Sequence, residues 1–253
     1  MAEVDVEVTD GVATVTLNRP ERRNAISSAL LAALTSALTG LDQRGDVHAM
    51  VLTGADPAFC AGLDLRELER QGSALAVAVP TGRPVPELGT PLIGAVNGAA
   101  VTGGLELALH CDFLVASERA QFADTHARIG IQPGWGLTVL LPEAIGLRRA
   151  REMSGTGNFV SARTALEWGL VNHVVPHAEL LGFARALAAD IASNDTEAVR
   201  AVYSTYRQGS LVPAGQALAL EARAHAQWRG GGIDPGEVAS RRGSVIERGR
   251  SQA

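Results

Sequence analysis

Two segments of the chain share one order of features, and this shared order limits the folds open to it. In the first segment, Leu92–Val96 is a short apolar run typical of a buried strand, Asn97-Gly98 marks a turn, and Gly103-Gly104 precedes good helix formers. Residues 49–68 repeat the order of strand, glycine-bearing loop and helix. The first turn of a helix presents unpaired N–H groups, and glycine lets a ligand approach them closely. The pattern predicts an α/β fold with a loop that can hold an oxyanion.

Glu106 lies one turn into the helix that follows Gly103-Gly104, where its carboxylate could serve as a general acid or base beside that oxyanion. Taken alone, the segment is explained better by a tight connection, with Glu106 as a favourable partner of the helix dipole. Its interpretation therefore depends on the rest of the chain.

The composition excludes several classes of function. The net charge is −5 and the pI is about 5.7, so the chain lacks the basic face that nucleic-acid binding needs. All 22 basic residues are arginines, which excludes Schiff-base chemistry on a lysine and leaves guanidinium or backbone N–H groups to hold an anion. Cys60 and Cys111 do not make a disulfide framework, and no metal-binding motif is present in the sequence, so we expect no metal.

The sequence also predicts the compartment. The first residues alternate acidic and apolar side chains, unlike a signal peptide. The longest unbroken apolar run, Ala74–Val79, is too short to span a bilayer. We therefore expect a cytoplasmic protein without a membrane partner.

Other patterns predict the order of elements. Val4–Asn18 alternates around Asp10-Gly11 and indicates a hairpin. Ser27 is a candidate cap for an amphipathic helix over Ser28–Asp42, and the strand after it implies a parallel crossover. Asp64 with Glu67 resembles a capping box at the next helix start.

The second half is predicted to become helical. Residues 71–89 are expected to form a loop or a mobile helical segment, which is the best candidate for a substrate lid, and residues 120–136 a loop. The change from strand–helix alternation to continuous helix near Ser193 predicts a core of residues 1–193 and a helical region of residues 194–253. Further helices are expected over 137–145, 148–153, 162–168, 178–192, 196–208 and 213–228, with a polar helix from about Pro235.

Several motifs occur together in one order. Phe59–Leu65 resembles F-x-A-G-x-D-[IL], residues 95–107 resemble A-V-N-G-x-A-x-G-G-x-E-L, and residues 18–25 resemble N-R-P-x-x-x-N-A. These are motifs of the enoyl-CoA hydratase/isomerase, or crotonase, superfamily. Shorter matches that also fit are Ala120–Phe122, Pro133-Gly134 and residues 169–171.

The resemblance implies a fold and a ligand. The fold would be a crotonase-like spiral of ββα units, with a C-terminal helical region used for trimerisation in a homotrimer or a dimer of trimers. The ligand would be an acyl-CoA thioester, and no separate cofactor is implied because coenzyme A is part of the substrate. The backbone N–H groups of Leu63 and Gly103 would bind the thioester oxygen and stabilise the enolate formed from it.

The resemblance also indicates where coenzyme A would lie. The adenine would contact the backbone around Ala61 and Leu65, and the phosphates would lie near Arg22 and Arg23. Those two arginines are explained equally well as solvated surface residues, and Glu21 stands where relatives often have Lys or Arg. The residues expected at the coenzyme A and substrate site are Arg22, Arg23, Ala25, Ala61, Gly62, Asp64, Leu65, Gly104, Pro133 and Trp135.

The chain departs from the family at one catalytic position. Hydratases of this family use two glutamates around one water; the first falls on Glu106, and the position of the second is occupied by His126. Histidine can also act as a general acid or base. Asp124 could orient that imidazole or act itself, although an ordinary loop-stabilising role is the more common explanation for such an Asp.

We therefore expect an acyl-CoA-processing enzyme, a lyase that hydrates a trans-2-enoyl-CoA to a 3-hydroxyacyl-CoA through an enolate. The alternatives are another enolate reaction, such as isomerisation, decarboxylation or thioester hydrolysis, or a member that binds acyl-CoA without turnover because His126 replaces the second glutamate. Isomerisation ranks below hydration, since family isomerases commonly depend on the glutamate that is missing.

Overall fold

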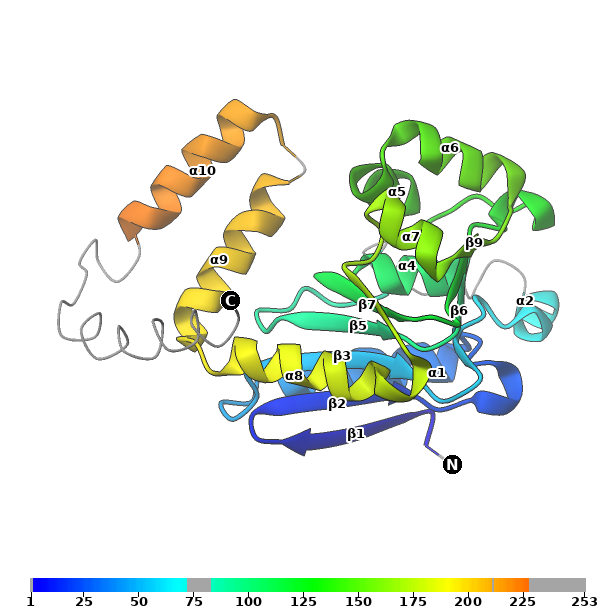
Figure 1. The fold of residues 1–253 in the computed structure, drawn as a ribbon, viewed down its shortest axis with the longest axis horizontal. Helices are drawn as coiled ribbons and strands as arrows, with labels where there is room; N and C mark the ends of the chain where they lie inside the picture. The colour runs from blue at the N-terminus through cyan, green and yellow to red at the C-terminus, as the bar shows by residue number, and fades with distance from the viewer. Residues whose placement is uncertain (1, 72–82, 211, 228–253) are drawn as a thin grey trace. The chain divides into compact units, whose positions relative to one another are not determined.

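A computed structural model describes residues 2–71, 83–210 and 212–227 of the protein. The chain divides into two compact units, residues 1–199 and residues 200–253. The first unit contains both β-sheets and every predicted site residue (Figure 1). Most of the lid expected over 71–89 and the helix expected from Pro235 lie outside the described residues.

The larger sheet has six strands in the order β1-β2-β3-β5-β7-β10. β1 and β2 form the predicted antiparallel hairpin, and Asp10 and Gly11 between them have positive φ angles, as a tight hairpin turn requires. The other neighbouring pairs are parallel, so the predicted crossover is confirmed. The strands are β1 (Val4–Thr9), β2 (Val12–Leu17), β3 (Ala49–Gly54), β5 (Leu92–Val96), β7 (Phe113–Ser117) and β10 (His173–Val175).

The central strands of this sheet are buried on both faces: β3 and β5 are buried along their whole length, and their successive side chains point to opposite faces. Val51 and Val115 pack with α8 (Leu180–Ala192) in one apolar cluster. Leu52 belongs to the other, larger cluster, which includes the leucines of α1 (Ser28–Asp42). Helix α1 begins as predicted, since the Ser27 hydroxyl oxygen accepts a hydrogen bond from the Leu30 N–H at 3.1 Å.

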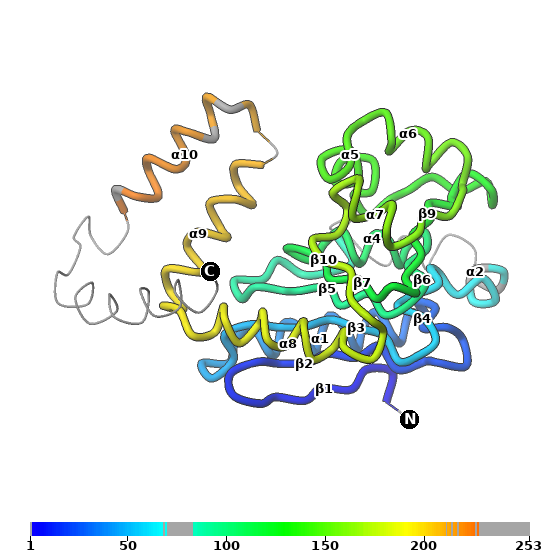
Figure 2. Tube along the Cα trace, viewed as in Figure 1, coloured from blue at the N-terminus to red at the C-terminus, as the bar shows by residue number. Residues whose placement is uncertain are grey.

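A smaller sheet of four strands, in the order β4-β6-β8-β9, was not predicted. Its strands are β4 (Ala58–Cys60), β6 (Ala99–Val101), β8 (Gln121–Ala123) and β9 (Val160–Ser161), and Figure 2 labels β4, β6 and β9 along the trace. The expectation of a plain loop over 120–136 was therefore wrong at its start. Strands of two or three residues are too short to show an alternating pattern in the sequence.

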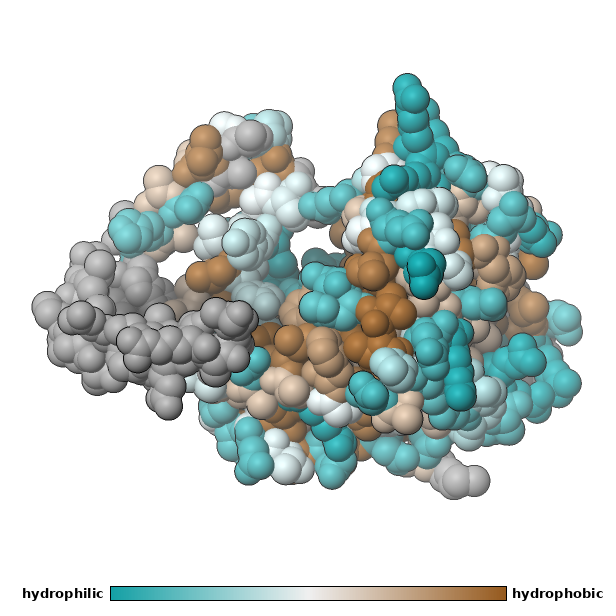
Figure 3. Space-filling model, in the orientation of Figure 1, coloured by the Kyte–Doolittle hydropathy of each residue, from teal (hydrophilic) through white to brown (hydrophobic). Residues whose placement is uncertain are grey.

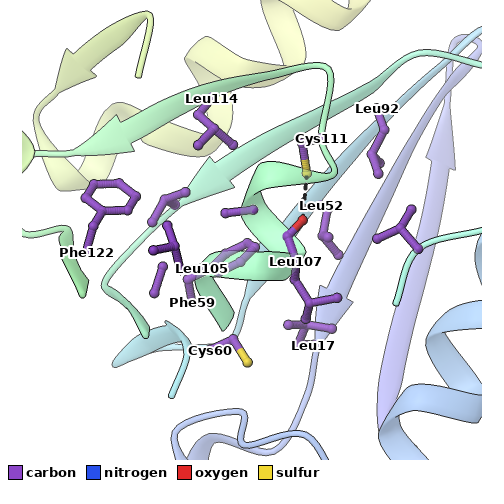
Figure 4. Close-up of a cluster of buried hydrophobic side chains, with 14 of the residues drawn as sticks. Leu17, Leu52, Phe59, Cys60, Leu92, Leu105, Leu107, Cys111, Leu114 and Phe122 are labelled. Carbon is purple, nitrogen blue, oxygen red and sulfur yellow. Dashed lines mark hydrogen bonds between the residues drawn. The ribbon is translucent and has the colours of Figure 1, made fainter. Parts of the chain in front are cut away.

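Helix α4 (Gly103–Leu109) is embedded in the core, as Figure 4 shows. Its Leu105 and Leu107 lie among apolar side chains from the strands, and the Cys111 thiol just beyond it donates to the Leu107 carbonyl oxygen at 3.7 Å. The helix is therefore fixed by packing on several sides. The remaining helical elements among the described residues before α9 are η1 (Pro20–Arg22), α2 (Leu65–Gln71), η2 (His126–Ile129), α5 (Leu137–Ile145), α6 (Leu147–Thr156), α7 (Ala162–Trp168) and η3 (His177–Glu179).

The described residues after 195 form helices in the places predicted for 196–208 and 213–228: α9 (Thr196–Gly209) crosses the boundary at residue 199, and α10 (Ala214–Gln227) follows it. On the first unit, Leu181, Phe183 and Leu187 of α8 are only partly buried, and Figure 3 shows apolar surface over that helix. No helix in the described part of the chain has both the length and the hydrophobicity needed to cross a bilayer.

Candidate active site

The predicted site residues follow three strands of the smaller sheet. Leu63 comes after β4, Gly103 after β6, and Asp124 and His126 after β8. β4 pairs with β6 and β6 with β8 in parallel, so the carboxyl ends of all three strands meet at one edge. Ligands of α/β proteins commonly bind at such an edge. The smaller sheet therefore gathers residues that are up to 63 positions apart in the sequence, from Leu63 to His126.

The loops that carry Leu63 and Gly103 lie against each other. Gly62 has a φ of +96°, and a Cβ at this position would lie 2.9 Å from the Val101 carbonyl oxygen and 3.6 Å from the Gly103 nitrogen. A Cβ on Gly103 would lie 3.7 Å from the Leu63 nitrogen. Only glycine fits this conformation and this close approach without displacing a neighbour.

The backbone around the two predicted oxyanion donors, Leu63 and Gly103, is held by hydrogen bonds of its neighbours. The Ile26 N–H donates to the Gly62 oxygen at 2.7 Å, and the Asp64 N–H donates to the Ile26 oxygen at 2.9 Å, which fixes the peptides on either side of Leu63. Among the hydrogen bonds of the described residues, neither the Leu63 nor the Gly103 N–H has a protein acceptor. Two preorganised N–H groups side by side are the usual device for stabilising negative charge on a carbonyl oxygen.

A pair of threonines, absent from the predicted site, joins this pair of donors to the histidine loop. The Thr102 and Thr125 hydroxyl oxygens lie 2.5 Å apart, and the Thr102 N–H donates to the Ala123 oxygen at 2.8 Å. Thr102 directly precedes Gly103 and holds a φ of +55°, which is rare for a β-branched residue. Thr125 directly precedes His126. The contact spans 23 residues of sequence, so no local pattern could have indicated it.

Asp124 holds His126 at a fixed angle. The Asp124 Oδ1 lies 2.7 Å from His126 Nδ1 and also accepts a hydrogen bond from the His126 backbone N–H at 3.1 Å. Burial alone would raise the pKa of Asp124, but hydrogen bonds from His126 and Ser154 outweigh it and hold the pKa below its usual value. The carboxylate therefore only accepts, which places a proton on Nδ1 and directs Nε2 toward the rest of the site.

Glu106 is only 2% exposed and faces that imidazole. Its Oε1 accepts a hydrogen bond from the Trp135 backbone N–H at 2.9 Å, and its Oε2 lies 3.7 Å from His126 Nε2. That gap is too long for a direct hydrogen bond but allows one water to bond to both groups. Burial raises the pKa of Glu106, although the Trp135 N–H and His126 oppose the shift.

The environments thus shift the pKa values of two neighbouring carboxyl groups, Asp124 and Glu106, in opposite directions. Asp124 is kept ionised and orients the imidazole, whereas burial raises the pKa of Glu106 above its usual value, which suits a group that takes up and releases a proton. The Glu106 carboxylate on α4, the imidazole of His126 and the N–H groups of Leu63 and Gly103 lie where β4, β6 and β8 end. This arrangement can abstract and return a proton next to a carbonyl group.

The residues predicted around coenzyme A are less sharply defined. Arg22 and Arg23 are exposed, Leu65 is 49% exposed, and Pro133 is half-buried. Gly104 is packed against the chain itself, since a Cβ there would lie 2.1 Å from the Cys60 oxygen. Their part in binding stays a prediction.

Arg19 organises the loop near Leu63. Its guanidinium donates to the Ala25 oxygen at 2.5 Å and pairs with the Asp64 carboxylate at 3.1 Å. The other Asp64 oxygen accepts from the Arg66 N–H at 3.1 Å. Asp64 therefore binds within the protein and shapes the loop, rather than pointing a free charge at a ligand.

The predicted capping box was wrong in its second half. The Glu67 carboxylate does not return to its own helix start; it accepts hydrogen bonds from the backbone N–H and the hydroxyl group of Ser28, at 3.3 Å and 2.6 Å. It therefore connects α2 to the start of α1. Within the described residues, no group of three or more His, Cys, Asp or Glu side chains is placed to hold a metal ion.

Comparison with known proteins gives one family. A sequence model of the enoyl-CoA hydratase/isomerase family matches residues 7–229. A probable peroxisomal enoyl-CoA hydratase of Arabidopsis thaliana is 42% identical over 224 residues, which are 87% of this chain and 84% of the relative.

Solved structures agree. An enoyl-CoA hydratase from Mycobacterium smegmatis has a TM-score of 0.77 at 49% identity, with 90% of this chain and 98% of the other covered. An enoyl-CoA hydratase from Bacillus anthracis has a TM-score of 0.84 at 38% identity, with 88% and 89% covered. The fold of the chain is thus closely similar to that of solved enoyl-CoA hydratases.

Proposed function

The chain belongs to the enoyl-CoA hydratase/isomerase family, as its motifs predicted, and on that premise we propose that it hydrates a trans-2-enoyl-CoA to a 3-hydroxyacyl-CoA. It is then an enzyme of the hydratase-lyase type with the crotonase fold. The observation that carries the proposal is the Asp124–His126 pair facing the buried Glu106 across 3.7 Å.

The thioester oxygen is bound by the N–H groups of Leu63 and Gly103. When a nucleophile adds at C3, negative charge develops on this oxygen, and the two donors stabilise the resulting enolate. Because both donors belong to rigid loops that need no rearrangement, each is worth roughly 10²–10³ in rate. The side chain of Leu63 has no part in this role.

Glu106 acts as the base toward water. Its Oε1 is occupied by the Trp135 N–H, so Oε2 is the oxygen that takes a proton from the water as the water oxygen bonds to C3. His126, held by Asp124, accepts a hydrogen bond from this water at Nε2 and so orients it, and protonated Glu106 then returns its proton to C2. One water is thus divided between C3, which gains the hydroxyl group, and C2, which gains a proton.

Thioester hydrolysis is the second candidate. An imidazole that is hydrogen-bonded to a buried carboxylate through Nδ1 is a general base in its own right, and a water activated by His126 could attack the thioester carbon instead of C3. Isomerisation and decarboxylation use the same enolate. Binding of acyl-CoA without turnover is the remaining possibility, and the retained Glu106 argues against it.

A panel of enoyl-CoA thioesters of different chain length separates these reactions when the products are followed by mass spectrometry. Hydration adds water, hydrolysis releases free coenzyme A, and decarboxylation releases carbon dioxide. We expect the first outcome, and we expect Glu106→Gln to bind acyl-CoA normally while losing turnover. Equal activity of Glu106→Gln and the unaltered enzyme on the best substrate would refute the role of Glu106.

Three further features are part of the proposal. The coenzyme A contacts follow the residues predicted above, and no cofactor besides the coenzyme A moiety takes part. Three copies assemble through the C-terminal helices, alone or as a dimer of trimers, which light scattering of the purified protein would test. The cytoplasmic location stays a prediction from the sequence.

A further inference from the structure

His110 is a histidine that the proposed reaction does not use, although it lies next to the site. It follows α4 directly, four residues after Glu106. Residues four apart lie on the same face of a helix, so Glu106 and His110 project toward the same neighbour. That neighbour is the segment around Trp135.

The two side chains bond to the backbone of Trp135 on both sides, Glu106 to its N–H group and His110 to its carbonyl group. Its N–H donates to Glu106 Oε1 at 2.9 Å, and its carbonyl oxygen lies 2.8 Å from His110 Nε2. A carbonyl oxygen only accepts, so His110 Nε2 carries the proton and donates. Gly136 is adjacent with a φ of +96°, and a Cβ on it would lie 3.6 Å from His110 Nε2, so the chain passes His110 closely.

Trp135 also contacts the oxyanion loop. A Cβ on Gly103 would lie 3.2 Å from Trp135 Cζ3, and Trp135 is only 4% exposed. The position of this one residue therefore affects the oxyanion pair through its ring and the catalytic base through its backbone N–H. The segment from Gly130 to Gly136 is irregular and contains three glycines and a proline, so few local interactions fix it. The helix that follows begins at Leu137.

We propose that His110 is a positioning residue for the proposed hydration: it fixes the Trp135 peptide so that the Trp135 N–H occupies Glu106 Oε1 and leaves Oε2 to the water. The inference rests on the proposed function, because it assigns His110 a role in orienting that base.

The charge state of His110 suits this role. Burial is the main reason that its pKa lies below the usual value; Arg83 lowers it further, and the Trp135 carbonyl acts in the opposite direction. The imidazole is then neutral at pH 7, with a single N–H directed at Trp135, and it adds no charge near Glu106. The titratable groups that do face Glu106 are His126 and Asp124.

The test compares His110→Leu, which cannot donate, with His110→Gln, whose amide N–H can. Loss of one neutral hydrogen bond corresponds to about a fivefold to tenfold lower kcat for His110→Leu, with KM nearly unchanged. The Trp135 N–H favours ionised Glu106, so its loss should also move the acid limb of the kcat/KM profile up by about half a pH unit. His110→Gln should restore both quantities.

If the acid limb of the kcat/KM profile does not shift in His110→Leu, the positioning role is overturned. The same conclusion holds if the only change in that variant is a lower denaturation midpoint. Failure of His110→Gln to restore the limb would overturn it as well. Glu106→Gln is measured in the same series: if it is inactive, these outcomes concern His110 alone. If it keeps full turnover, the proposed function fails and this inference fails with it.

Discussion

Two histidines of this protein sit between polar partners at the ends of strands, one at each sheet. At the smaller sheet, His126 lies between Asp124 at 2.7 Å and Glu106 at 3.7 Å. At the larger sheet, His177 lies between the Ser117 hydroxyl oxygen at 3.0 Å and the Asp56 carboxylate at 3.1 Å. Both clusters resemble a relay of acid, imidazole and second polar group. They differ in whether a nitrogen of the imidazole remains available to a ligand.

The His177 cluster is closed. The Ser117 hydroxyl oxygen already accepts from the Arg119 N–H, Ser117 has no exposed surface, and the Asn97 amide donates to Asp56. The hydrogen bond from Asn97 is the main reason that the pKa of Asp56 lies below its usual value. Both imidazole nitrogens are within hydrogen-bond distance of a partner, so the cluster ties strand ends together and leaves no site for a substrate.

In the His126 cluster the two partners of the imidazole lie at different distances, Asp124 within hydrogen-bond distance and Glu106 beyond it. Its imidazole is held on one side only, and the opposite nitrogen faces a carboxylate at a distance that a water can bridge. The contrast shows that a triad of residue types is weak evidence of catalysis. The gap and the neighbouring oxyanion donors distinguish the site from a structural network.

The contrast between the two clusters would be refuted if the enzyme kept its activity without the His126 imidazole. We expect His126→Ala to lower kcat by about 10²–10⁴-fold, the usual contribution of a general acid–base group. His177→Ala is the matched control, since it removes an imidazole with an Asp partner from the larger sheet and should leave kcat within twofold of the unaltered enzyme, as a change outside the site. If both variants keep full activity, the second catalytic group lies elsewhere, and Asp124 is the next residue to replace.

The smaller sheet can also be tested through its backbone. Gly62→Ala would force a Cβ to within 2.9 Å of the Val101 oxygen at a positive φ, so the Leu63 N–H must move away from the thioester oxygen. Loss of one oxyanion donor lowers kcat by about 10²–10³-fold. Gly182 in α8 has no atom within 4 Å of its Cβ position and provides the control. Gly182→Ala should keep full activity; a similar loss in both variants would contradict the assignment of Leu63.

The pH dependence should separate Glu106 from ordinary carboxylates. Burial raises its pKa, so activity should be lost, as pH falls, above the usual glutamate value of about 4.3. The free energy of unfolding should depend on pH in the opposite direction to the activity. Between the unfolded and the folded pKa the native state holds the extra proton, so Glu106 costs stability as pH rises through that window. Denaturant titrations should find Glu106→Gln relatively more stable at pH 7 than at pH 4. The same difference at both pH values would contradict the raised pKa.

The smallest expected effect is the change in stability when the His177 cluster is altered. His177→Ala removes two hydrogen bonds and leaves the buried Ser117 hydroxyl without its imidazole partner, which should lower the free energy of unfolding by about 1–2 kcal/mol. Urea denaturation measures the change, and His177→Gln, which can keep one of the two bonds, should lose less. A stability equal to that of the unaltered protein would show that the network contributes nothing to folding.

The larger sheet could be predicted because its information is local. The alternation around Asp10-Gly11 specified the hairpin, the leucine spacing after Ser27 specified α1, and the continuous apolar runs specified the parallel strands. The strands of the smaller sheet have only two or three residues each and carry no period. They become strands only because their neighbours provide hydrogen-bonding partners.

The candidate site follows the same division. The sequence by itself determined which residues have the right chemistry: glycines that allow a close approach at 62 and 103, a carboxylate one turn into a helix, and a histidine at 126. Only the tertiary structure decided which nitrogen of His126 faces Glu106, that Thr102 meets Thr125, and that His110 and Glu106 hold the same tryptophan. The reason is physical: residue types and turn conformations are local properties. The distances that make a catalytic group arise from parallel strand pairing, which joins segments far apart in the chain.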